Sequence, residues 1–91
     1  MNNTNAYLNE IERLKSIFEC LKEQVESEKL PCYFAEDRFT KLKKEEKRLK
    51  AYLKCMNAEY FILEELDNLI ALTKQFLQDI LDIIDIQRKQ I

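Results

Sequence analysis

The sequence predicts an all-α protein, and three observations carry that prediction. Glycine is absent and Pro31 is the only proline, so the residues that form hairpins and sharp turns are missing. Good helix formers (Leu, Lys, Glu, Gln, Ala) dominate the chain. Apolar residues recur at alternating steps of three and four, which places them on one face of a helix. We therefore expect a small antiparallel helical bundle or a helical hairpin with coiled-coil-like seams.

Length and composition narrow the class further. A chain of 91 residues has room for a single domain, 1–91, with a limited core. Its 46% apolar and 35% charged residues are typical of neither a disordered nor a membrane protein. The N-terminus lacks the basic start and apolar core of a secretory signal. The cysteines are three in number and include no Cys-x-x-Cys pair, which fits a reducing compartment. We therefore expect a cytoplasmic protein without a membrane span.

The first helix is predicted at about residues 5–29, with Thr4 or Asn5 as its N-cap. A turn is expected around residues 30–33, because Pro31 cannot donate its amide to a continuing helix. Because Pro31 can also lie in the first turn of the next helix, Tyr33 and Phe34 are either helical or plug this turn against the core, and we favour the plug. The apolar seam of the first helix comprises Tyr7, Ile11, Leu14, Phe18, Leu21 and Val25.

The second helix is predicted at about residues 34–64, and its seam is interrupted once, by Glu46. A carboxylate at a seam position needs a partner from another helix, or else it lies at an exposed part of the seam. We favour the exposed position. The apolar members of this seam are Phe39, Leu42, Leu49, Leu53, Met56, Tyr60 and Leu63.

The end of the second helix is the open question of the sequence. Asn57 could end it, since Asn tolerates the left-handed conformation found at helix ends, but the seam passes Asn57 in register. The apolar pattern changes phase instead at Asp67–Asn68. We therefore predict a third helix at about residues 66–89, with one long helix over 34–89 as the alternative.

The apolar face of residues 66–86 is broader than one two-helix seam requires. This breadth favours contact with two neighbouring helices or with a partner chain, and a long helix would leave an overhang that a second copy could cover. We therefore expect a homodimer. The candidate oligomer or partner seam comprises Leu49, Leu53, Met56, Tyr60, Leu63, Phe76, Leu77, Ile80 and Ile84.

Charge is concentrated in the middle of the chain. Residues 38–54 hold eight basic and two acidic residues, whereas both flanks are net acidic. Such a face either contacts an anion outside the protein or is balanced by the protein's own acidic helices, and we favour the second interpretation. The candidate anion or partner contact face comprises Arg38, Lys41, Lys44, Lys47, Arg48 and Lys54.

Nothing in the sequence points to catalysis, a cofactor or a metal. The chain has no histidine and no glycine-rich loop, and its carboxylates follow the pattern of helix surfaces. We expect a non-catalytic protein–protein interaction module that self-associates: an adaptor, a small inhibitor or a chaperone-like subunit of bacterial or phage origin. The alternative is a nucleic-acid-associated module that uses the basic face of residues 38–54.

Overall fold

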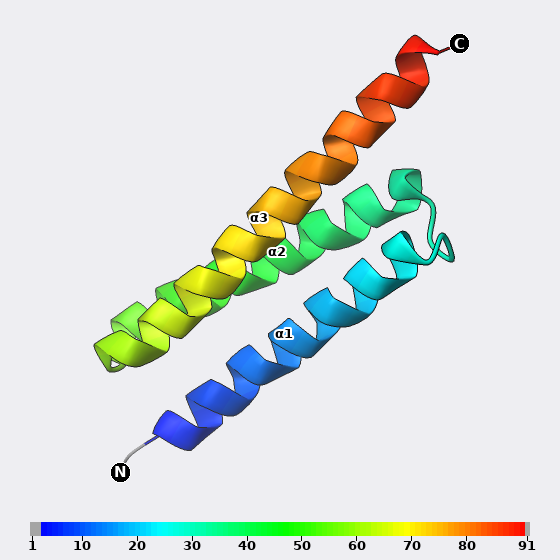
Figure 1. The fold of residues 1–91 in the computed structure, drawn as a ribbon. Coiled ribbons are helices and arrows are strands. Elements are labelled where there is room, and N and C mark those ends of the chain that lie inside the picture. Colours follow the sequence, from blue (N-terminus) through cyan, green and yellow to red (C-terminus); the bar gives the residue numbers. More distant parts are fainter. Residues whose placement is uncertain (1–2, 91) are drawn as a thin grey trace.

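Three helices build the protein, as the computed structural model shows for the residues that it describes, 3–90. They are α1 (Thr4–Glu26), α2 (Cys32–Cys55) and α3 (Tyr60–Lys89). The chain runs up through α1, down through α2 and up again through α3 (Figure 1). The prediction of a small, all-α antiparallel bundle is confirmed.

The helices differ in length, and the difference leaves one of them protruding. α3 has 30 residues, whereas α1 has 23 and α2 has 24. At a rise of ~1.5 Å per residue α3 is ~45 Å long, about 10 Å longer than either neighbour. Its C-terminal end projects past the turn between α1 and α2 (Figure 1). We call this end of the bundle, where α1 stops and α2 starts, the α1–α2 end.

The core consists of two groups of buried side chains along the bundle. In the larger group, nearer the α1–α2 end, the ring of Phe18 lies edge-on to Phe39 and Phe76, with ring centroids 5.9 and 6.1 Å away. The second group, nearer the α2–α3 turn, consists of Ile11, Leu53, Ile62 and Leu66. The larger group consists of Leu14, Phe18, Ala35, Phe39, Leu42, Leu69, Leu77, Ile80 and Ile84.

The turn between α1 and α2 differs from its prediction in two ways. α1 ends at Glu26 rather than near residue 29, and Glu28 takes a left-handed backbone conformation with φ of 61°. The aromatic pair Tyr33 and Phe34 lies inside α2 and is 67% and 61% exposed, so the expected plug is wrong. α2 starts directly after Pro31, and the inward positions of its first turns go to Ala35 and Phe39, which are fully buried. The start of α1 also differs, because its N-cap is Asn3, which forms no side-chain capping bond.

The turn between α2 and α3 corrects the main prediction about the second helix. α2 ends at Cys55 rather than near residue 64, and α3 starts at Tyr60 rather than near residue 66. Asn57 has φ of 55°, and the N–H of Ala58 donates to the carbonyl of Leu53 at 3.0 Å, so Asn57 ends the helix in the left-handed manner. The single long helix over 34–89 is therefore also wrong.

The apolar seam predicted for the second helix continues across this turn in sequence spacing only, and not in the structure. Met56 and Tyr60, which continue this seam, are 48% and 79% exposed. Ile62 and Leu66 fill the corresponding core positions of α3. The phase change at Asp67–Asn68 lies inside α3 and marks no boundary.

No helix within residues 3–90 is long and apolar enough to cross a membrane.

Candidate interaction surfaces

The structure divides the predicted oligomer or partner seam into residues inside the bundle and residues at its surface. Four members are buried in the chain's own core, so they cannot contact a partner unless the bundle opens: Leu53, Leu77, Ile80 and Ile84. Three are half-buried against that core: Leu49, Leu63 and Phe76. Met56 and Tyr60 are exposed.

Large apolar side chains are exposed in three places on the molecule, and most of them are not members of the predicted seam. Tyr33 and Phe34 form an edge-to-face pair, with centroids 5.9 Å apart, at the start of α2. Leu72, Ile83 and Ile86 are 55%, 42% and 56% exposed along α3. Grouped apolar side chains at a surface mark sites of contact with other molecules. A further group at the α2–α3 turn consists of Tyr52, Met56, Tyr60 and Phe61.

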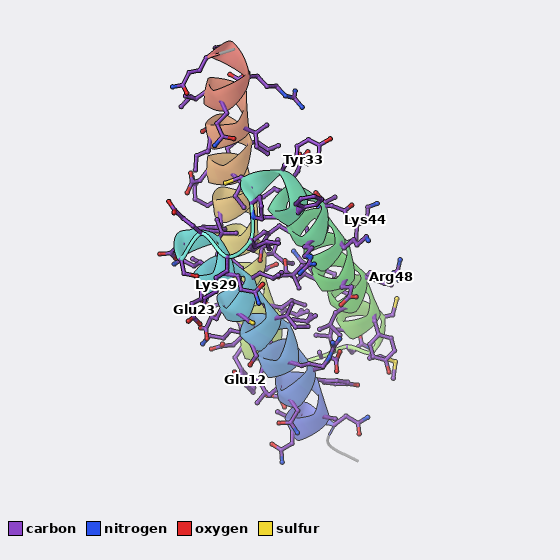
Figure 2. All side chains as sticks on the ribbon, turned by 90° about the vertical axis from the view of Figure 1, so that its right-hand side faces the viewer. Glu12, Glu23, Lys29, Tyr33, Lys44 and Arg48 are labelled. Atoms are coloured by element: carbon purple, nitrogen blue, oxygen red, sulfur yellow. The ribbon has the colours of Figure 1, made fainter. Side chains whose placement is uncertain are left out.

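The predicted basic face lies at the surface over its whole length. Tyr33, Lys44 and Arg48 lie along the side of α2 that points away from the other two helices, whereas Glu12 and Glu23 lie on the opposite side of the molecule, on α1 (Figure 2). All six predicted members are exposed: Arg38, Lys41, Lys44, Lys47, Arg48 and Lys54.

The acidic helices neutralise little of this basic face. Lys50 of α2 pairs with Asp67 of α3 at 2.6 Å, while Lys41 pairs with Asp37 of its own helix at 3.1 Å. The ion pair between α1 and α2 joins a cation of α1 to a carboxylate of α2, since Arg13 lies 3.8 Å from Glu45. It therefore neutralises no basic residue of α2. In the described part of the chain, five members of the face form no ion pair: Arg38, Lys44, Lys47, Arg48 and Lys54.

A groove of about 540 Å³ opens at the α1–α2 end, between the last turn of α1, the turn itself and α3. Its volume lies within the range typical of ligand and side-chain pockets. Its lining is mostly apolar, and its three carboxylates, on Glu26, Glu28 and Asp79, are exposed and form an acidic rim. The apolar lining consists of Val25, Leu30, Pro31, Cys32, Phe76, Ile80 and Ile83.

This groove was not predicted, although the position of the first turn in the sequence indicates where it would form. A turn near Pro31 in an up-down-up bundle places the end of α1 beside the C-terminal part of the third helix. Residues from both segments must then meet at the α1–α2 end, as Val25 and Ile83 do.

Glu46 is fully buried, so its predicted exposed position is wrong. The hydroxyl of Thr73 on α3 donates a hydrogen bond of 2.7 Å to Oε2 of Glu46. Its Oε1 is buried without a hydrogen-bond partner. Burial penalises the charged carboxylate and raises the pKa of Glu46 to about 7, although the hydrogen bond from Thr73 opposes this shift. Glu46 therefore belongs to the packing of α2 against α3 and offers no accessible contact.

Within residues 3–90, no group of three or more His, Cys, Asp or Glu side chains could hold a metal ion. No known protein family, curated protein or solved structure matches this chain. The candidate sites that the structure offers are the basic face of α2, the exposed apolar groups and the groove.

Proposed function

We propose that this chain is a non-catalytic protein–protein interaction module that self-associates and docks helical faces to a partner protein. The observation that supports it best is that nine large apolar side chains of the described residues are exposed on a bundle whose core is already filled, at the start of α2, at the α2–α3 turn and along α3. Single exposed apolar residues are ordinary, but grouped ones favour contact with another surface. We place the module in a bacterial cytoplasm, as an adaptor, a small inhibitor or a chaperone-like subunit of bacterial or phage origin.

Sedimentation velocity over the micromolar range tests self-association. We expect the mass to rise with concentration toward that of a homodimer, because a dimer can cover exposed side chains of α3 such as Ile83 and Ile86. A mass that stays monomeric over the whole range would contradict this part of the proposal.

The basic face of α2 is the surface that we assign to the partner protein. Its unpaired cations favour a partner with an acidic surface, since complementary charge accelerates association and selects against basic competitors. Lys44 and Arg48 are exposed, and reversing their charge breaks no ion pair of the described residues.

Cross-linking in native cells, followed by mass identification, tests this assignment. We expect the wild type to capture a partner that the double variant Lys44→Glu/Arg48→Glu loses. The matched control is Lys15→Glu/Lys74→Glu, which makes the same change in net charge on the exposed surfaces of α1 and α3. Loss of the partner in both variants, or in neither, would contradict a contact through α2.

A second candidate function is nucleic-acid association through the same face. Its support is the unpaired cations of α2, among them Lys44, with Lys47 and Arg48 three and four residues after it and thus near it on the helix. Each phosphate contact gives binding a steep salt dependence, with a slope of roughly 0.9 per contact on duplex DNA. Fluorescence anisotropy with generic DNA and RNA duplexes tests it: binding at low salt that Lys44→Glu/Arg48→Glu abolishes supports it, and absence of binding removes it.

A further inference from the structure

We propose that the acidic-rimmed groove at the α1–α2 end receives the C-terminal end of α3 from a second copy of this chain. The contact is reciprocal, so one two-fold axis relates two copies that each fill the other's groove. This inference rests on the self-association proposed above and names the surface that carries it.

The groove and its proposed occupant lie at the same end of the molecule. α3 projects beyond the α1–α2 turn, as both views show (Figures 1 and 2). Ile86 lies near this tip and is 56% exposed, and Ile83, which lines the groove, is 42% exposed. When two such ends meet antiparallel, each tip passes over the other copy's groove. A single two-fold contact therefore covers both apolar surfaces, as an isologous interface requires.

The positions of the isoleucines define the register of this contact. The lining of the groove includes Ile80, one helical turn before Ile83. In an antiparallel pair of helices, opposite residues have numbers with a constant sum. Placing Ile86 of one copy at the level of Ile80 of the other, which is buried and serves only to mark the register, therefore sets Ile83 opposite itself, on the two-fold axis.

The charges at the two surfaces are complementary. Glu26, Glu28 and Asp79 form the acidic rim of the groove. Arg88 and Lys89 follow Ile86 at the tip of α3, where both are exposed. Lys89 pairs with Asp85 of its own helix at 3.2 Å, but Arg88 forms no ion pair within the described residues.

In the proposed register, the tip of one copy brings a cation to the acidic rim of the other copy's groove. The remaining carboxylates of this part of α3, on Asp82 and Asp85, do not line the groove. Asp85 is next to Ile86, and its charge is offset within its own helix by the ion pair with Lys89.

The contact is smaller than a permanent interface. It consists of one groove and one helix tip on each copy, whereas stable complexes bury about 800 Å² on each partner. We therefore expect a reversible dimer with a dissociation constant in the micromolar range.

Sedimentation of three variants of the full chain tests the contact. We expect Ile86→Asp and Ile83→Asp to raise the dissociation constant at least about tenfold, because each places a carboxylate on an apolar contact next to an acidic rim. The matched control is Leu72→Asp, since Leu72 is 55% exposed on the same helix but does not line the groove. Thermal melting of each variant verifies that the monomer still folds.

A disulfide placed on the proposed axis gives an independent reading of the register. In a background with Cys20, Cys32 and Cys55 replaced by Ala, we expect Ile83→Cys to form a covalent dimer under mild oxidation, because a disulfide needs Cβ atoms about 4 Å apart. Leu72→Cys in the same background is expected to stay monomeric on a denaturing gel.

The outcomes separate this inference from the function on which it rests. If the wild type associates but Ile86→Asp associates equally well, or if Leu72→Cys cross-links and Ile83→Cys does not, the groove contact is wrong and self-association stands. If the wild type is monomeric throughout the micromolar range, self-association itself fails and the groove contact falls with it.

Discussion

At the scale of single residues, Glu46 is the most unusual feature of the protein. It is fully buried between α2 and α3, and it accepts one hydrogen bond, from Thr73. Along α2 it lies between Leu42 of one core group and Leu53 of the other. An apolar residue there would pack without a desolvation cost, whereas a carboxyl group permits only those helix alignments that bring Thr73 to it. The pair therefore selects a register for α2 against α3.

Glu46 makes stability depend on pH. Its pKa is raised from 4.5 to about 7, so the folded protein favours the protonated form. The contribution of protonated Glu46 to the free energy of unfolding is fully present below about pH 4.5 and is lost as pH rises through about 7. The loss amounts to about 3 kcal/mol. Urea unfolding at a series of pH values measures it.

The control for that experiment is Glu46→Gln, which has nearly the same shape but does not titrate. We expect its unfolding free energy to change less between pH 4.5 and 7 than that of the wild type. An equal pH dependence in the two proteins would assign the effect to other carboxyl groups. Glu10 cannot replace Glu46 in this role, because its hydrogen bond with Arg13 lowers the pKa of Glu10.

At the scale of helices and turns, a single residue ends α2. Asn57 adopts a positive φ of 55° in a chain without glycine. Asn is one of the few other residues that take this conformation at little cost. The short connection after it, through Ala58 and Glu59, then leads directly into α3.

Substitution of Asn57 tests this explanation of the turn. We expect Asn57→Ala to lower the unfolding free energy by about 1 kcal/mol, because a Cβ without a compensating polar group disfavours positive φ. Asn57→Gly is expected to stay close to the wild type, since glycine takes this conformation freely. Urea denaturation measures both, and equal stability of the Ala and Gly variants would contradict the explanation.

The same turn separates two residues that belong to one apolar row in the sequence. Leu53 is fully buried with Ile11, Ile62 and Leu66, whereas Tyr60 is 79% exposed. We expect Leu53→Asp to lower stability by more than about 3 kcal/mol, because it combines a cavity with a buried charge. Tyr60→Asp is expected to cost less than about 0.5 kcal/mol, as most surface substitutions do. Similar melting temperatures for the two variants would contradict this difference and would support one uninterrupted seam through Leu53 and Tyr60.

At the scale of the whole molecule, the proposed contact surfaces lie apart. The groove is at the α1–α2 end and is lined by α1, the turn and α3, whereas the basic face runs along the outer side of α2 (Figure 2). No member of the basic face lines the groove, so substitutions at the two surfaces are expected to act independently. One copy could then bind a second copy and a partner protein at the same time.

This independence is itself testable. We expect Lys44→Glu/Arg48→Glu to leave the dissociation constant of the dimer within about twofold of the wild type, because changes at separate sites add with little coupling. Sedimentation velocity at matched salt measures it. A large change in dimerisation would place the basic face in the contact between copies.

Much of the fold could be predicted from the sequence because it depends on local pattern. The seam of α1 was predicted, and the structure buries its central members Ile11, Leu14 and Phe18. The exposure of the basic face followed from the same periodicity, since an outer helical position faces away from the seam whatever the seam packs against.

The sequence by itself therefore determined the helical class, the inward faces of α1 and of most of α2, and the concentration of positive charge on α2. The tertiary structure alone decided where α2 ends, that Glu46 is buried against Thr73, and that the end of α1 forms a groove with α3. The physical reason is that periodicity reports the face of one helix. A turn made by one Asn leaves the spacing of three and four undisturbed, and the cover over each apolar residue comes from segments far away in the chain.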